Sequence, residues 1–177
     1  MLGKTVWRSA FVGVAAIIIL TSKPAAALDL SGGVHLGGVL IGTTPRFALS
    51  PRLGIAERTD WGFLLAFEEV ASILPAFGVG GVGVYNHTSV AIGYAWKNGT
   101  FKIGPSLVVY STPVCGLLQC ARLAGISPGL ATHVDYYFSD SLGVAASATV
   151  DWLTGSVVLP AGIAASVLVG PVLRWRL

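Results

Sequence analysis

Large apolar side chains alternate with small or polar ones in eight stretches of this chain, and the last stretch shows the alternation most clearly. One parity there holds Ile163, Ala165, Val167, Val169, Pro171, Leu173, Trp175 and Leu177, and the other holds Gly162, Ala164, Ser166, Leu168, Gly170, Val172, Arg174 and Arg176. Successive residues of a β-strand point to opposite sides of the sheet. The pattern therefore predicts strands with one oily surface and one tighter, more polar surface.

The connections between these predicted strands alternate in character. Residues 57–60, 97–100 and 139–141 are short and polar, and the Asn98-Gly99 pair in the second is typical of a tight turn in which both positions tolerate positive φ. The other four connections, near 43–45 and over 72–81, 112–123 and 153–161, are mostly longer and contain Pro or Gly. The strands predicted between them are 29–41, 46–56, 61–71, 83–96, 101–111, 124–138, 142–152 and 162–176.

Composition places this pattern in a membrane. Only 11% of the residues are charged, whereas soluble proteins average about 25%. No apolar stretch after residue 27 is long enough for a spanning helix, and an open sheet edge cannot be hydrogen-bonded in hydrocarbon. We therefore predict an all-β fold over residues 28–177, an eight-stranded antiparallel up-and-down transmembrane β-barrel with its large apolar side chains facing lipid.

The N-terminus resembles an export signal. Lys4 and Arg8 precede an apolar run over residues 11–20, and Ala25-Ala26-Ala27 follows as a small-residue cleavage site. The alternative is an uncleaved anchor, but the run has about half of the ~20 residues that a spanning helix needs. Removing residues 1–27 leaves eight bases and eight acids. We therefore predict a neutral, exported protein of the bacterial outer membrane that does not bind nucleic acid.

Charged residues within the strands mostly share the parity of the small residues, so they are predicted to face the lumen. Glu69 is the exception, and we expect it to mark a bend where the third strand leaves the membrane. Eight strands enclose a space just wide enough for side chains to fill. Because unpaired buried charges are costly, we expect the inward charges to pair in a polar lumen network of Arg52, Glu68, Lys102, Asp135, Asp151 and Arg174.

Aromatic residues and connection lengths together predict the orientation. The short turns should face the periplasm and the longer loops the outside, as in outer-membrane barrels. Amphipathic rings favour the headgroup level of a membrane, and five aromatic residues stand beside the short turns. They are Trp61, Trp96, Phe101, Phe138 and Trp175.

The cysteine and histidine residues predict a disulfide but no metal site. Cys115 and Cys120 are predicted to form a small disulfide after export into an oxidising compartment. A metal site there would lack neighbouring ligands, and His35, His87 and His133 stand on three separate strands. The glycine-rich run over residues 77–84 has no following Lys-Ser/Thr pair and is not a phosphate loop. No metal or other cofactor is predicted.

Strand count, parity and turn asymmetry together resemble those of the small eight-stranded outer-membrane proteins of Gram-negative bacteria, the OmpA/OmpX/opacity-type barrels. The resemblance covers residues 28–177 and is one of pattern, without a distinctive motif. It implies that the last strand is an assembly signal read by the barrel-assembly machinery, here carried by Leu173, Trp175 and Leu177, although Phe is usual where Leu177 stands. Pro171 in this strand predicts a local defect in the hydrogen-bond ladder.

The favoured function is a non-enzymatic barrel with a filled lumen, in contact with outer-membrane lipid and with a structural or surface-interaction role. A second hypothesis is a lipid-modifying enzyme that uses His133, Asp135 and Ser147, or His87 and Ser89. The pattern is also compatible with a minor channel, a carrier of hydrophobic solutes or a soluble lipocalin-shaped barrel. Apolar loop residues would suit an unknown protein or a hydrophobic ligand; they are Ile73 to Phe77, Leu117, Leu118 and Val157 to Pro160.

Overall fold

The structure is a computed structural model, and it describes residues 27–42, 44–75, 82–115, 120–153 and 162–177, without the side chains of 114–123. Eight β-strands occupy these residues. They are β1 (Ala27–Ile41), β2 (Thr44–Arg58), β3 (Phe63–Leu74), β4 (Gly83–Trp96), β5 (Gly99–Cys115), β6 (Cys120–Tyr137), β7 (Leu142–Leu153) and β8 (Gly162–Arg176).

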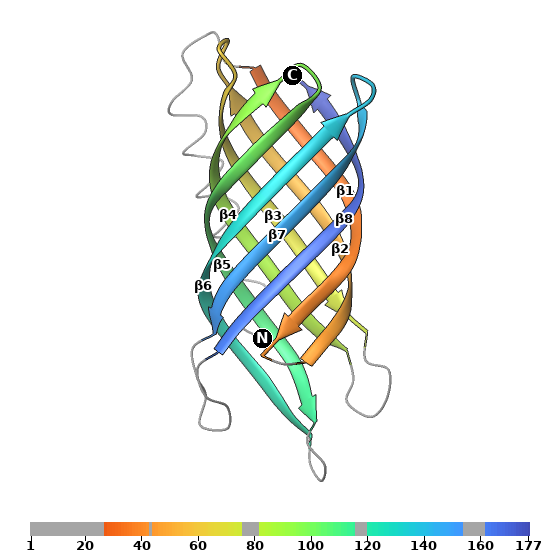
Figure 1. The fold of residues 1–177 in the computed structure, drawn as a ribbon, viewed down its shortest axis with the longest axis vertical. Helices are drawn as coiled ribbons and strands as arrows, with labels where there is room; N and C mark the ends of the chain where they lie inside the picture. The colour runs from red at the N-terminus through yellow and green to blue at the C-terminus, as the bar shows by residue number, and fades with distance from the viewer. Residues whose placement is uncertain (1–26, 43, 76–81, 116–119, 154–161) are drawn as a thin grey trace.

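Each strand pairs antiparallel with the next one along the chain, and β8 pairs antiparallel with β1, so the sheet closes into an eight-stranded barrel. The three short turns lie at one end, at the top of Figure 1, together with the C-terminus. The strand ends that the other connections join lie at the opposite end. The fold class predicted from the alternation is therefore confirmed. Within the described part of the chain, no helix is long and apolar enough to cross a membrane.

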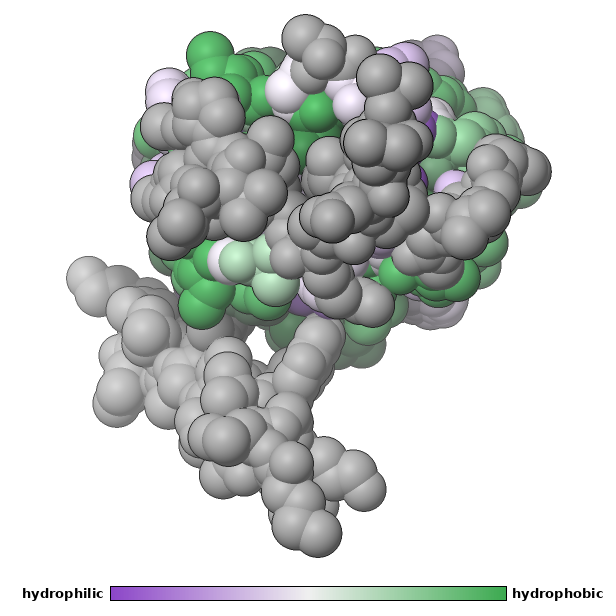
Figure 2. Space-filling view, turned by 90° about the horizontal axis from the view of Figure 1, so that it is seen from below, coloured by the Kyte–Doolittle hydropathy of each residue, from purple (hydrophilic) through white to green (hydrophobic). Residues whose placement is uncertain are grey.

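Side chains follow the predicted alternation around the barrel. Large apolar residues of every strand stand exposed on the outer surface, including Leu53, Ile92 and Val167, whereas small and charged residues are buried in the lumen. Seen from the end of the longer connections, hydrophobic residues cover most of the visible circumference (Figure 2). Because period-two alternation assigns every residue of a strand to one face, the sequence was sufficient to predict this division.

The turns differ from the prediction in detail. The structure places Gly99 in β5, which leaves Lys97 and Asn98 as the turn, and neither of these residues has positive φ. Positive φ occurs instead at Gly42 and Gly62 among the described residues. The expected connection over 112–123 is much shorter, because β5 and β6 continue pairing as far as Cys115 and Cys120. Their hairpin extends beyond the other strands at the lower end of Figure 1.

Prolines coincide with interruptions in the strand pairing. The register of the described strands skips two residue pairs at each of three places, and an outward-facing proline stands at each one: Pro51 between β2 and β3, Pro105 between β4 and β5, and Pro171 between β1 and β8. Proline has no N–H to donate to a ladder. The defect expected at Pro171 is thus present, and the same explanation covers the two others.

Close packing of β1 against β8 gives a matched test of the fold. A Cβ atom added to Gly37 would lie 2.0 Å from the carbonyl oxygen of Val167, whereas one added to Gly38 would meet nothing nearer than 3.8 Å. We expect Gly37→Ala to lower the free energy of unfolding by about 1–3 kcal/mol, as overpacking does, and Gly38→Ala to leave it nearly unchanged. Urea unfolding of the protein in detergent micelles measures both, and equal stabilities for the two variants would contradict the close approach.

Candidate functional site

An ion pair crosses the middle of the lumen. Arg52 on β2 donates from Nη1 to Asp135 Oδ1 on β6 at 2.6 Å and from Nη2 to Asp135 Oδ2 at 3.2 Å. Its Nε donates to Glu68 Oε2 on β3 at 2.8 Å. Strands β2 and β6 stand on opposite walls of the closed barrel. The Arg52–Asp135 contact therefore ties the two walls together through the lumen.

Lys102 completes a ring of alternating charges. This residue on β5 donates from Nζ to Glu68 Oε1 and, at 2.9 Å, to Asp135 Oδ2. Thr100 adds a donor to Asp135 Oδ2 at 2.9 Å. We name Arg52, Glu68, Lys102 and Asp135 the ion ring; each of these side chains is at most 3% exposed. The two positive and two negative charges balance, which is what permits burial at this depth.

Asp151 lies in a second polar cluster, nearer the longer connections. Its Oδ2 accepts the hydroxyl of Tyr85 at 2.7 Å and lies 2.7 Å from His87 Nε2. Thr149 donates to the same oxygen at 3.2 Å, and Ser106 donates to Oδ1 at 3.4 Å. This cluster again joins facing walls, since Tyr85 and His87 belong to β4 and Asp151 belongs to β7.

Apolar side chains fill the lumen beyond this cluster, toward the longer connections. Among the described side chains they come from every strand except β6, and all are buried: Val39, Ile41, Ala48, Val70, Leu74, Tyr85, Val108, Tyr110, Leu153, Ala164 and Leu168. We name them the apolar layer. An ion moving along the barrel axis would have to lose its water in this layer, in addition to separating the ion ring. The lumen thus presents two different barriers in series.

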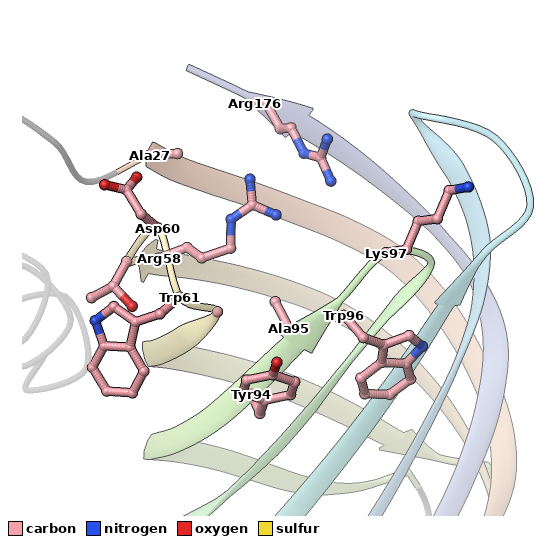
Figure 3. A pocket seen from close by; sticks show the side chains of 11 residues that line it. Ala27, Arg58, Asp60, Trp61, Tyr94, Ala95, Trp96, Lys97 and Arg176 are labelled. Atoms are coloured by element: carbon pink, nitrogen blue, oxygen red, sulfur yellow. The ribbon is translucent and has the colours of Figure 1, made fainter.

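The short-turn end of the lumen is open. Arg58, Lys97 and Arg176 project into a cavity of about 760 Å³, from the end of β2, the β4–β5 turn and the end of β8 (Figure 3). The Arg174 guanidinium stacks 3.7 Å over the Tyr137 ring and donates to the carbonyl oxygen of Asp140. Arg174 therefore does not join the ion ring.

The residues proposed for a hydrolytic site do not form one. Ser89 Oγ lies 3.2 Å from His133 Nε2, but His133 Nδ1 has no hydrogen-bond partner in the described structure, so no carboxylate orients the ring. Ser147, beside His133 in the register, makes no side-chain hydrogen bond there. His87 contacts Asp151 instead of Ser89. Ser89, His133, Ser147 and His87 are each at most 3% exposed.

Several sequence predictions fall partly outside the described structure. The signal peptide over residues 1–27 lies outside it except for Ala27, and so do most of the apolar loop residues. Of these, Ile73 faces outward and Leu74 belongs to the apolar layer, and both extend β3. The assembly-signal residues Leu173, Trp175 and Leu177 stand exposed on the outer surface. Glu69 does not mark a bend, because β3 continues beyond it to Leu74.

Three partners of the lumen charges were missed from the sequence. Tyr85 and Thr100 bind the two aspartates, and Tyr137 supports Arg174. All three have the inward parity of their strands, so strict counting along each strand would have placed them in the lumen. Their contacts could not have been read in that way, because parity specifies a face and not a height along the barrel.

Removing one charge from the ion ring should lower the free energy of unfolding more than removing one positive and one negative charge together. Glu68→Gln leaves Arg52 and Lys102 with one carboxylate, and we expect it to lower the free energy of unfolding by about 3–5 kcal/mol. Adding Lys102→Met to this variant leaves the Arg52–Asp135 pair balanced and should restore most of the loss. Urea unfolding in detergent micelles measures both, and a double variant no more stable than Glu68→Gln would refute the charge-balance argument.

The cysteine pair can be tested directly. Cys115 and Cys120 are partners in the β5–β6 register, and directly paired antiparallel residues have Cα separations that a disulfide accepts. Their side chains lie outside the described residues, so the bond remains a prediction. Protein isolated from the cell envelope should resist alkylation until it is reduced, and then take up two alkyl groups by intact mass. Alkylation before reduction would contradict the bond.

Solved structures similar to this one include small outer-membrane barrels. Neisserial surface protein A matches with a TM-score of 0.56 at 12% identity, over 84% of this chain and 97% of that one. Ail of Yersinia pestis, solved with the heparin analogue sucrose octasulfate, matches with a TM-score of 0.59 at 9% identity, over 85% and 99%. The N-terminal barrel domain of Pseudomonas aeruginosa OprF matches with a TM-score of 0.50 at 10% identity, over 85% and 98%.

Sequence comparison adds no closer relationship. No protein-family model matches the chain, and no curated protein matches it either. The identities to the solved structures are low enough that the likeness concerns the fold alone. In that respect the resemblance predicted from the alternation is confirmed: the chain has the fold of the small eight-stranded outer-membrane barrels.

Proposed function

We propose that this protein is a sealed, non-enzymatic barrel of the bacterial outer membrane, with a structural or surface-interaction role. The observation that carries the proposal is the filling of the lumen by the ion ring and, beyond it, the apolar layer. Both consist of side chains contributed by opposite walls. A lumen filled in this way would hold the wall rigid and would block the passage of solutes.

Placement in the outer membrane is supported by the exposed apolar belt and by the neighbours of the same fold. Short turns and both ends of the barrel domain would face the periplasm, and the longer connections the outside. The aromatic residues Trp61, Trp96, Phe101, Phe138 and Trp175 are all exposed beside the short turns, as expected at a headgroup level. Export through the N-terminal signal is part of the same proposal.

Partners follow from this placement. Outer-membrane lipid would contact the apolar belt along its whole height. The barrel-assembly machinery would read β8 during insertion, where Leu173 and Trp175 stand on the outer surface. The longer connections would offer the surface for an unknown protein or a hydrophobic ligand.

A lipid-modifying enzyme is less well supported. The serine–histidine contact between Ser89 and His133 is buried beneath the barrel wall and lacks an orienting carboxylate in the described structure. In the same part of the chain, no group of three potential metal ligands gathers to hold an ion. The charges of the ion ring neutralise one another, so they are not directed at a substrate.

Conductance tests the sealed lumen. In planar lipid bilayers the purified protein should give no steady open levels, under conditions in which an open porin reconstituted in parallel does conduct. The double variant Glu68→Gln/Lys102→Met should also stay closed, because the apolar layer remains in place. Steady open levels in the unmodified protein would favour the channel hypothesis and overturn the proposal.

A further inference from the structure

The cavity at the short-turn end, which we name the rim cavity, is lined by two kinds of side chain. Its basic lining residues are Arg58, Lys97 and Arg176, and its aromatic ones are Trp61, Tyr94 and Trp96. In Figure 3 the three rings lie along the lower edge, with the three basic side chains above them. Ala27 also lines the cavity, and the predicted cleavage after it would place the Leu28 amino group there as a further cation.

Two of the three basic side chains are not neutralised within the described residues. Arg176 Nε lies 3.6 Å from Asp29 Oδ1, whereas Arg58 and Lys97 form no ion pair and no side-chain hydrogen bond there. Asp60, which also lines the cavity, is not paired with either of them. Charges of one sign around a cavity concentrate the electrostatic potential and attract ions of the opposite sign. The rim cavity therefore favours an anion.

Backbone hydrogen bonds hold the β2–β3 side of the rim cavity in a fixed shape. Ala95 donates its N–H to the Gly62 carbonyl oxygen at 2.7 Å, and Gly62 donates its own N–H to the Thr59 carbonyl oxygen at 3.0 Å. The Trp61 ring stacks on the Phe63 ring, with their centroids 5.5 Å apart. The cavity volume of about 760 Å³ falls within the range of about 300–1,000 Å³ that ligand pockets occupy. The site is thus formed before a ligand arrives.

Aromatic residues place the rim cavity at a definite depth in the membrane. Trp61 and Trp96 belong to the exposed aromatic residues beside the short turns, together with Phe101, Phe138 and Trp175. Amphipathic rings favour the headgroup level. Because two of these residues line the cavity, the embedded barrel would hold it at the level of the lipid phosphates. The leaflet concerned is the periplasmic one, which the short turns of outer-membrane barrels face.

We propose that the rim cavity binds the headgroup of an anionic phospholipid. The proposal rests on the membrane placement proposed above. The three basic side chains donate to the phosphate oxygens, as guanidinium and ammonium groups do, and the glycerol and first methylenes pack against the three aromatic rings. A soluble phosphate would contact the cations and leave the aromatic side of the cavity without a partner. The two unpaired cations favour a headgroup with a net negative charge over a zwitterionic one.

Native mass spectrometry of the purified protein in detergent measures the binding. Titration with phosphatidylglycerol should give a single bound lipid at concentrations at which phosphatidylcholine stays unbound. Arg58→Gln and Lys97→Gln should each raise the Kd for phosphatidylglycerol about tenfold, which corresponds to about 1.4 kcal/mol. Equal binding of the two lipids to the unmodified protein would overturn the inference.

Matched controls separate this site from general attraction to the protein. Arg46→Gln removes a positive charge at the opposite end of the barrel, where Arg46 donates to the Pro113 carbonyl oxygen, and should leave the Kd unchanged. Trp61→Ala should weaken binding, whereas Phe138→Ala, which removes an exposed ring outside the cavity, should not. Faster migration of each unboiled variant on a gel reports a folded barrel. An unweakened Arg58→Gln variant, or an equal loss in either control, would overturn the inference.

Inorganic phosphate distinguishes a lipid site from a site for soluble anions. Added in large excess, it should leave phosphatidylglycerol bound, because it gains no contact with the aromatic rings. Displacement of the lipid by inorganic phosphate would indicate a soluble-anion site and would overturn the inference. A carbonate wash separates this failure from that of the proposed placement: an embedded protein that binds no phosphatidylglycerol stays in the membrane fraction, and a protein that is not embedded is released.

Discussion

Closure of the sheet is the constraint on which the rest of this structure depends. In hydrocarbon every backbone N–H and C=O needs a partner within the protein, so β8 must pair with β1 as the other strands pair with their neighbours. Closure also defines an inside that eight strands make narrow. Glycine is then required where walls approach closely, as at Gly37, and three outward prolines, Pro51, Pro105 and Pro171, coincide with a local loss of pairing.

A narrow lumen explains why its charges form a ring. Side chains from opposite walls meet, so Arg52 and Asp135 can bind directly across the barrel, and Glu68 and Lys102 balance them. Each member depends on the others, because a single unpaired charge would be buried without compensation. The same narrowness places Tyr85 and Asp151 in contact and lets apolar side chains fill the end near the longer connections.

The outer surface obeys a different rule, since lipid offers no hydrogen bonds. Nearly every outward position on the described strands is apolar, which makes the few polar ones informative. Glu69 and Asn86 retain hydrogen-bonding capacity that the protomer itself does not satisfy.

The sequence by itself determined the strand count, the order of neighbours and the face that each side chain takes, because alternation has a period of two residues and a slip would expose charges to lipid. It also placed all four members of the ion ring in the lumen. It did not predict the positive φ values at Gly42 and Gly62, and it ended β5 too early and began β6 too late. Turn geometry and strand ends depend on how neighbouring strands pair.

Only the tertiary structure decided which inward charges meet. Arg52 and Asp135 are 83 positions apart in the chain, and their contact depends on the stagger of all the strands between them. Parity assigns a side chain to the lumen but not to a height within it, so Asp151 and Arg174 could not be separated from the ring in advance. The height of a side chain along the barrel axis depends on the register of all the paired strands. The sequence of one strand does not specify that register.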